Sequence, residues 1–351
     1  MTRRTALLGI VVLALVCATV VGVLWWRDSR RSELSRAAEL LPAETVRASW
    51  TDWAGIRAEL GVHLDGDADG DQIRAFADQA FEGDLSSASS AVDSSVALQQ
   101  KFGFSPATAD WELYGVARKG AVMVMRLPDT ADFDAIEGRL DGLGYGRPAD
   151  RTGVWTGGAD LVPAIDPTLT PELQYVALLA DQHLVLTSDT AGYLDTALRS
   201  ATGSTDGLTG VDDLIGKAGD PLSAVVFPGD FACTDLAMSQ ADDGDQRLAK
   251  SLVRDAGDVN PLQGLLVAAL PDRRVRVVMA FDGDDQAAAN ARARATLASG
   301  EAPGKGGAFS DRFRLTSAAT DGPLVVLDLT AKPGQYVVSE LTSGPVLFET
   351  C

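Results

Sequence analysis

Apolar and polar positions along the chain follow two periods. Trp53, Ile56 and Leu60 recur at helical spacing, which predicts a helix over about residues 52–61. Elsewhere, short apolar runs are joined in pairs by turn residues and predict β-hairpins. Four hairpins are expected, at residues 111–117 with 121–127, 173–180 with 184–187, 262–270 with 274–281, and 313–319 with 324–329. Hairpins combined with helices predict an α+β fold of mainly antiparallel sheets with helices packed on one face.

The order of the predicted elements repeats along the chain. Each half reads strand, helix, hairpin, helix, hairpin, helix, at a period of roughly 160–170 residues. Two equivalent helices open with the same residues, Gly70-Asp71-Gln72 and Gly244-Asp245-Gln246. We therefore expect an internal duplication, with one α+β repeat over residues 45–205 and a second over residues 206–351. The pattern leaves open whether the two repeats share one sheet.

One stretch, from Ala6 to Trp26, is apolar throughout and contains no charged residue. At ~1.5 Å per residue a helix of this length spans ~31 Å, the thickness of the hydrocarbon core of a bilayer. We expect a transmembrane anchor, with residues 1–27 as cytoplasmic tip and span and residues 28–44 as a helical stalk. A cleaved signal peptide is the alternative, although its apolar core usually has only ~7–15 residues. Cys17 is expected to be an ordinary residue of the span and not a lipidation site.

Charge and composition describe the part of the chain after the anchor. Residues 28–351 contain 27 Lys and Arg against all 49 Asp and Glu, a formal charge of −22. This charge argues against nucleic acid or anionic lipid as a partner, because both require a positive surface. The flanking arginines favour neither orientation of the anchor, but long domains translocate largely regardless of charge. We expect a single-pass protein of the cell membrane with a folded, extracytoplasmic body.

Two cysteines follow the anchor, Cys233 and Cys351. In an oxidising compartment they are expected to form a disulfide that ties the last residue to the body. Two unpaired thiols are the alternative.

The acidic stretch at residues 65–71 is a candidate metal site. Asp65, Asp67, Asp69 and Asp71 occupy alternate positions and a glycine stands at position six, which is typical of a calcium loop. Position twelve is a phenylalanine where such loops carry glutamate. The alternative is a helix N-terminus with an aspartate cap and an acidic first turn. Calcium is the one cofactor that the sequence suggests.

Catalytic motifs are absent from the sequence. The chain has only His63 and His183, and it contains neither a nucleophile-elbow motif nor zinc-ligand spacing. Pairs of carboxylates arise by chance among 49 acidic residues, so they do not by themselves identify a glycosidase. Tryptophans of the body are expected to pack in the core or between domains, with a groove lining as the alternative; they are Trp50, Trp53, Trp111 and Trp155.

The anchor, the strand–helix stretch at residues 46–53 and the hairpin-then-helix run at residues 175–198 together resemble uncharacterised single-pass cell-envelope proteins of actinobacteria. The resemblance implies no known activity. We expect a non-catalytic binding or scaffolding protein that contacts another envelope protein or an apolar ligand between its halves. The alternatives are a carboxylate-dependent hydrolase acting on cell-wall material and a calcium-dependent module that uses residues 65–71.

Overall fold

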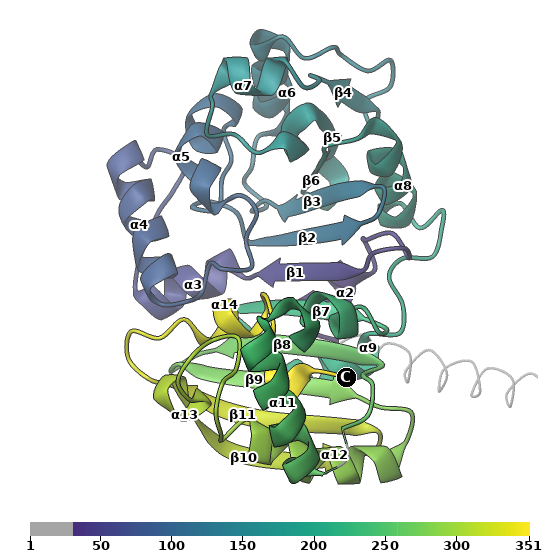
Figure 1. Cartoon of the computed structure of the whole chain (residues 1–351). Coiled ribbons are helices and arrows are strands. Elements are labelled where there is room, and N and C mark those ends of the chain that lie inside the picture. Colours follow the sequence, from purple (N-terminus) through teal and green to yellow (C-terminus); the bar gives the residue numbers. More distant parts are fainter. Residues whose placement is uncertain (1–30, 258) are drawn as a thin grey trace, which may run out of the picture.

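The computed structural model describes residues 31–257 and 259–351. It confirms an α+β fold, in which the described strands form one large antiparallel sheet with helices packed on it (Figure 1). The strands are β1 (Arg47–Thr51), β2 (Trp111–Ala117), β3 (Gly120–Arg126), β4 (Val154–Thr156), β5 (Tyr175–Leu179), β6 (Leu184–Ser188), β7 (Ser223–Pro228), β8 (Gly264–Leu270), β9 (Arg274–Ala280), β10 (Phe313–Asp321) and β11 (Leu324–Ala331).

Helices of the described residues are mostly short. They are α2 (Glu33–Ala38), α3 (Trp53–Leu60), α4 (Gly70–Glu82), α5 (Ser95–Ala97), α6 (Phe133–Leu143), α7 (Leu161–Ile165), α8 (Ala191–Ala201), α9 (Asp212–Ala218), α10 (Ala232–Asp235), α11 (Asp243–Ala256), α12 (Asp284–Leu297), α13 (Phe309–Arg312) and α14 (Val337–Leu341). Within residues 31–257 and 259–351, none combines the length and the apolar character that a membrane crossing requires. The expected anchor at residues 6–26 lies outside the described residues.

Local sequence sets where several helices begin and end. Asp52 caps α3, because its Oδ1 accepts the Gly55 N–H at 2.8 Å. Gly61 ends the same helix in the left-handed conformation, with φ of 64°. Asp132 caps α6 in the same way and accepts the Ala135 N–H at 3.0 Å. These boundaries lie close to those that the hydrophobic spacing predicts.

The sheet runs in the order β10-β11-β9-β8-β7-β1-β2-β3-β6-β5-β4. At its centre β1 pairs antiparallel with β7, so that Ala48 lies opposite Val226 and Trp50 opposite Ala224. Outward from this pair, β1-β2-β3-β6-β5 and β7-β8-β9-β11-β10 follow the same sequence of connections. The question that the sequence leaves open is thereby answered: both halves contribute to one sheet.

Helices cover both faces of the sheet, so the expectation that they pack on one face is wrong. Buried residues of α3, α4, α6 and α12 join one core cluster, which we call the first face. Buried residues of α2, α8 and α9 join a separate cluster on the other side, the second face. The cause is the apolar character of both sides of the central strands. In β3, for example, Met123 and Met125 face the first cluster while Val122 and Val124 face the second.

Residues 33–41 do not form the free helical stalk that we expected. Helix α2 ends at Ala38 and lies on the second face of the sheet. Leu34, Ala37 and Leu41 are at most 2% exposed, which removes from water the apolar side that made the segment look like a helix. The part of the chain that would lead away from the membrane is thus packed into the body.

A buried aspartate joins the two halves. Asp84 follows α4 and accepts the backbone N–H groups of Val338 at 2.6 Å and of Ser339 at 3.2 Å, at the beginning of α14. Its side chain is 7% exposed, and burial raises the pKa of Asp84 to about 6 despite these donors. Nearby, the ring of Phe81 lies 5.2 Å from that of Tyr336. These hydrogen bonds and this ring contact therefore fasten the end of α4 to the start of α14.

Asp84→Asn is expected to remove part of the pH dependence of stability. Because the pKa of Asp84 is higher in the folded than in the unfolded chain, its contribution is full below the unfolded value near 3.8 and is lost as the pH rises through about 6. The shift corresponds to about 3 kcal/mol over the whole window, of which about 2 kcal/mol falls between pH 4.5 and 7.5. Chemical denaturation of both proteins at pH 4.5 and 7.5 measures it. If the free energy of unfolding changes by the same amount between the two pH values in both proteins, Asp84 is not responsible for the pH dependence.

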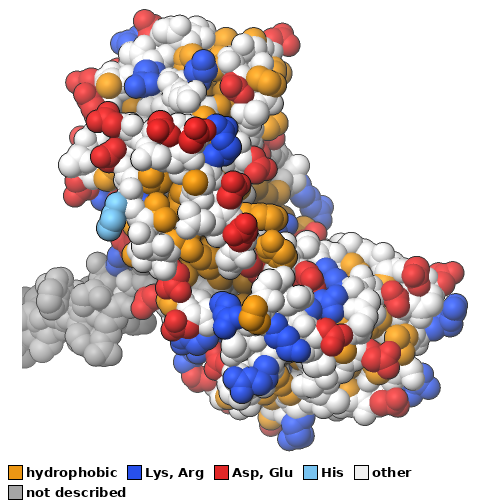
Figure 2. All heavy atoms as spheres, turned by 90° about the vertical axis from the view of Figure 1, so that its left-hand side faces the viewer, with side chains coloured by type: hydrophobic (Ala, Val, Ile, Leu, Met, Phe, Trp, Pro, Cys, Tyr) orange, Lys and Arg blue, Asp and Glu red, His pale blue; other side chains and the backbone are white. Residues whose placement is uncertain are grey.

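The surface view in Figure 2 shows the side of the molecule that carries α3 and α4. Apolar side chains gather between the two lobes, and acidic side chains are scattered around them. Phe81 is the large apolar residue of the described chain that stands out from the core, with 59% exposure. The two halves thus meet through apolar contacts as well as through the sheet.

Candidate binding site

The candidate site is a cavity of about 330 Å³ between α2 and one end of the sheet. Trp111 begins β2, Arg126 ends β3 and Leu184 begins β6, and these three residues lie side by side in register. Its size is at the lower end of the range for small-molecule sites, ~300–1,000 Å³. The lining residues are Glu33, Arg36, Ala37, Leu40, Trp111, Arg126, Gln182 and Leu184.

The floor of this cavity, which we call the α2 pocket, is apolar and held firmly. Trp111 is 6% exposed, and its ring lies 5.2 Å from the ring of Trp50. Trp50 is fixed in turn, because its Nε1 donates to the carbonyl oxygen of Pro221 at 3.2 Å. Leu184, 3% exposed, completes the floor from β6. The indole pair therefore forms a pre-positioned surface for an apolar group.

Two arginines and one glutamate stand at the rim of the α2 pocket. The Arg126 guanidinium forms an ion pair with Asp129 at 2.9 Å and lies 3.8 Å from Asp110. Arg36 donates through Nη1 to the carbonyl oxygen of Arg31 at 2.8 Å, and no ion pair of Arg36 occurs among the described residues. Arginine donors here suit an acceptor-rich polar group above the apolar floor.

Carboxyl groups with raised pKa values lie elsewhere and serve the fold. Glu112 is 1% exposed, and burial raises its pKa. Its oxygens accept from Trp53 Nε1 at 3.1 Å, from Ser89 Oγ at 2.6 Å and from the Ser90 N–H at 2.7 Å. These bonds fasten the serine-rich segment before α5 to β2. Among the residues that the structure describes, Glu33 supplies the one carboxylate that lines the α2 pocket.

In the acidic loop at residues 65–71, Asp65 and Asp69 accept backbone N–H groups, and Asp71 accepts from the Arg74 side chain at 3.0 Å. Asp65 accepts the Asp67 N–H at 3.0 Å, and Asp69 accepts the N–H groups of Asp71 and Gln72, each at 2.9 Å. Asp69 with Gln72 forms a capping box at the start of α4. Within the described part of the chain, no three His, Cys, Asp or Glu side chains gather in a way that could hold a metal ion. Calcium binding by this loop stays a prediction.

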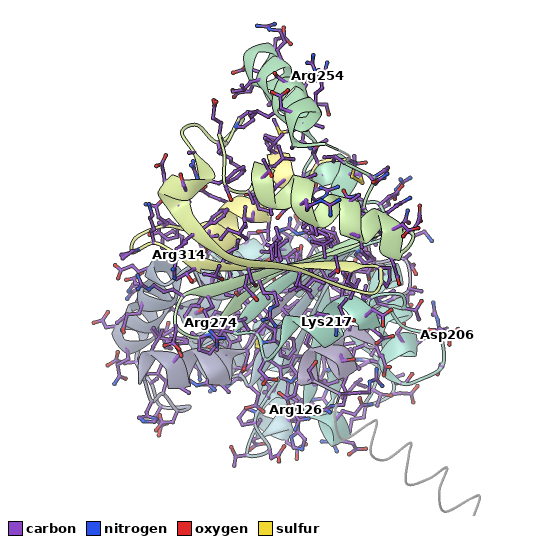
Figure 3. All side chains as sticks on the ribbon, turned by 90° about the horizontal axis from the view of Figure 1, so that it is seen from below. Arg126, Asp206, Lys217, Arg254, Arg274 and Arg314 are labelled. Atoms are coloured by element: carbon purple, nitrogen blue, oxygen red, sulfur yellow. A yellow bond between two sulfur atoms is a disulfide. The ribbon has the colours of Figure 1, made fainter. Side chains whose placement is uncertain are left out.

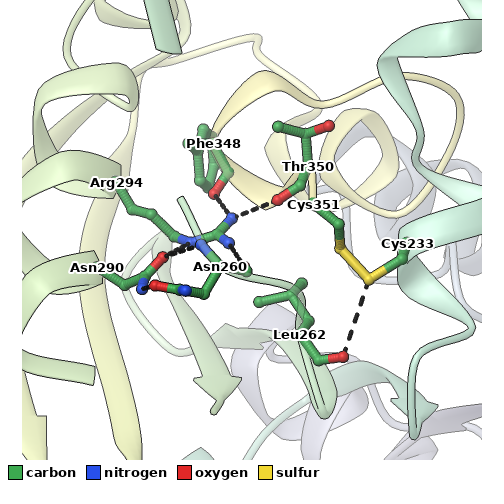
Figure 4. The surroundings of a disulfide bond; sticks show 8 residues. All are labelled: Cys233, Asn260, Leu262, Asn290, Arg294, Phe348, Thr350 and Cys351. Carbon is green, nitrogen blue, oxygen red and sulfur yellow. Dashed lines mark hydrogen bonds between the residues drawn. A yellow bond between two sulfur atoms is a disulfide. The ribbon is translucent and has the colours of Figure 1, made fainter. Parts of the chain in front are cut away.

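Cys233 and Cys351 form a disulfide with a Cα–Cα distance of 5.4 Å (Figure 4), the pairing favoured over two unpaired thiols. Beside it, Arg294 is fully buried and donates to the carbonyl oxygens of Phe348 and Thr350, each at 2.8 Å, and of Asn260 at 2.6 Å. Burial lowers the pKa of Arg294 to about 10. The C-terminal residues are thus fixed by a covalent bond and by one buried cation.

Of the residues that line the α2 pocket, the sequence marks Trp111 as a groove residue only as the alternative to a place in the core or between domains. Trp111 lines the pocket and its ring contacts that of Trp50, whereas the ring of Trp155 lies under the Arg147 guanidinium. The other lining residues come from three separate segments and carry no motif. The sequence signal that could have helped to locate the pocket is the apolar spacing after Glu33, which indicates that this segment packs against another part of the protein.

Comparisons with known proteins give few relatives. No family model matches the chain, and none of the curated proteins matches it. Similar solved structures include crystal forms I, III and IV of TP0453, at 8%, 9% and 9% identity and TM-scores of 0.39, 0.40 and 0.42. The similarity covers 87%, 86% and 87% of this chain and 98%, 97% and 96% of those chains. Likeness of this size carries no functional conclusion.

Proposed function

We propose that the protein is a membrane-anchored, extracytoplasmic binding protein of the cell envelope, which holds an amphipathic molecule in its α2 pocket. A transmembrane helix at residues 6–26 tethers a body made of two α+β repeats. The observation that carries the proposal is the position of the pocket: α2, the first described helix after the anchor, forms one of its walls.

The pocket lies within short reach of the proposed anchor. Six residues lie between Trp26 and Glu33, and the seven Cα–Cα steps from one to the other span at most ~25 Å in an extended chain. A molecule that leaves the outer face of the bilayer beside the anchor would therefore start within this distance of α2, one wall of the pocket. This proximity favours a ligand that partitions into membranes over a freely soluble one.

The composition of the pocket indicates the chemistry of its occupant. The indole of Trp111 and the side chains of Leu40 and Leu184 favour an apolar chain or ring. Arg36, which has no ion pair among the described residues, and the remaining N–H groups of Arg126 favour an acceptor-rich head group, which they would bind by charge-assisted hydrogen bonds. We therefore propose an amphipathic ligand with a small apolar portion, matched to a cavity of about 330 Å³.

Other functions are less well supported. A hydrolase acting on cell-wall material needs two carboxylates near its substrate, and in the described ranges the pocket lining contains one, that of Glu33. The carboxylates of Asp84 and Glu112 are occupied by bonds that hold the fold together. Scaffolding of another envelope protein stays a prediction that the pocket neither requires nor excludes.

Filling the α2 pocket is expected to weaken binding of a model amphipath. We would titrate 8-anilinonaphthalene-1-sulfonate, which carries apolar rings and a sulfonate, into residues 31–351. Leu40→Trp places an indole in the cavity and should weaken binding by at least about tenfold, because removal of roughly 60 Å² of apolar contact is worth ~1.4 kcal/mol. Fluorescence enhancement gives the affinity.

Leu198→Trp is the matched control, since Leu198 is a half-buried leucine on the same face of the sheet outside the pocket. It should leave the affinity unchanged. If Leu40→Trp binds the probe as tightly as the unaltered body, or if both variants weaken it equally, the α2 pocket is not the binding site.

A further inference from the structure

The strand β10 forms one edge of the sheet and is exposed over most of its length. It spans nine residues, and every residue from Thr316 to Asp321 is exposed. Figure 3 looks onto this end of the molecule, where Arg314 is labelled. The opposite edge differs, because β4 has three residues and its Thr156 is bridged by Gly146. Only the β10 edge thus offers a long strand to another chain.

Backbone groups on the outer side of β10 have no partner within the described chain. The backbone N–H and C=O groups of successive β10 residues point alternately toward β11 and away from it, so about half of them point outward. From Arg314 to Asp321, no backbone hydrogen bond to a described residue outside the β10–β11 pair occurs. Such a row of donors and acceptors is a template for one more antiparallel strand.

A bulge in β10 determines which side chains share a face. Arg314 and Asp321 are seven positions apart, so a regular strand would place them on opposite faces. The register shifts between Leu315 and Ser317, which leaves Thr316 as an extra residue. Consequently, Asp321 lies opposite Leu324 of the second face, and Arg314 lies opposite Thr330, on that same face.

The alternation on the rest of β10 is consistent with this assignment. Ala319 lies opposite Val326 of the second face. Leu315 and Ala318 lie opposite Leu329 and Leu327, which belong to the first face. The exposed part of the strand therefore presents a basic residue near one end, an acidic residue at the other, and small side chains between them.

We propose that β10 pairs with β10 of a second copy of this chain, antiparallel and about a two-fold axis through Ala318. In this register the Ala318 residues of the two copies face each other, and Ser317 faces Ala319 on both sides. Beyond the two bulges, Leu315 faces Thr320 and Arg314 faces Asp321. Every pair then joins residues of the same face, as an antiparallel ladder requires.

Charge and size select a second copy as the occupant of this edge. The register places a guanidinium opposite a carboxylate twice, once at each end of the joined strands. Alanine and serine at the centre allow the backbones to approach without steric conflict. Asp321 already forms an ion pair with Lys217 on α9, so a guanidinium from the second copy would join an existing charge pair. A strand of unrelated sequence would lack this two-fold match.

Cysteine crosslinking of the full-length chain in nanodiscs tests the register. All proteins carry Cys17→Ser, which removes the thiol of the anchor. Directly opposed residues have Cα atoms ~4.5–5.5 Å apart, within the range of a disulfide. Ala318→Cys should therefore give a covalent dimer under mild oxidation. Ala319→Cys is the matched control, because the two Ala319 residues are offset along the strands and lie beyond ~7 Å.

Charge exchange then tests the complementarity by analytical ultracentrifugation of the same preparations. Arg314→Asp places two acidic pairs in the interface and should weaken dimerisation by about tenfold. The double variant Arg314→Asp with Asp321→Arg restores opposite charges and should restore the dimer. Equal crosslinking at positions 318 and 319, a monomer at all concentrations, or crosslinking of Ala318→Cys to a different protein would overturn the proposal.

Discussion

Replacement of Cys233 and Cys351 by serine should lower the free energy of unfolding by up to ~5 kcal/mol, the value that chain entropy gives for a loop of this size. The disulfide closes a loop with a sequence separation of 118 residues. It ties the last residue of the chain to the segment at α10. Phe348, three residues before the end, packs against Phe309 at 4.9 Å and against Phe313 at 6.2 Å, so a loosened end also opens this aromatic cluster.

Guanidinium denaturation with and without a reductant measures the effect. The reduced protein and the Cys233→Ser/Cys351→Ser variant should unfold at the same, lower denaturant concentration. Cys17→Ser should behave as the unaltered protein. Coincident transitions of oxidised and reduced protein would contradict the structural role of this bond.

The second large effect is expected from Arg294→Met, which should cost ~3–5 kcal/mol because it removes one partner from a buried charged network. Arg294 binds the carbonyl oxygens of Phe348, Thr350 and Asn260, all of which would lose a donor. It also lies near Glu349, whose carboxylate is fully buried and has no hydrogen-bond partner among the described residues. Burial holds the pKa of Glu349 well above its usual value, and the Arg294 charge counteracts this rise.

A double-mutant cycle measures the link between these two residues by chemical denaturation. Glu349→Gln should be less destabilising, or stabilising, when Arg294 is already methionine, since no buried charge then lacks its counterpart. Arg292→Met, an exposed position of the same helix, should change stability by less than ~0.5 kcal/mol. Additive effects of Arg294→Met and Glu349→Gln would contradict the coupling.

Much of the fold follows from local sequence. Alternating or continuous apolar runs predicted β2, β3, β8 and β9 nearly at their observed ends, because turn residues such as Pro271-Asp272 mark hairpins directly. The pairing of β1 with β7 was not predictable, since it joins residues far apart in sequence through apolar surfaces that many strands share. That helices cover both faces of the sheet was not predictable for the same reason, because it depends on contacts between segments far apart in the sequence.

The α2 pocket was not predictable from the sequence for a related reason. Its rim is made of Glu33, Arg36, Arg126 and Gln182, which are ordinary surface residue types with no fixed spacing. Only the sheet register brings Arg126 beside Trp111. The sequence shows the apolar spacing of α2. Because α2 follows the proposed anchor directly, that spacing suggested a helical stalk. In the structure, α2 is instead buried against the second face of the sheet.

The central claim is that the α2 pocket holds an amphipathic molecule from the membrane. Mass spectrometry of solvent extracts from full-length protein, purified from the membranes of its own host, tests this most directly. We predict one amphipathic compound at close to one molecule per chain in the unaltered protein and in Leu198→Trp, and its loss in Leu40→Trp. The same compounds in all three preparations, or none in any of them, would contradict the account.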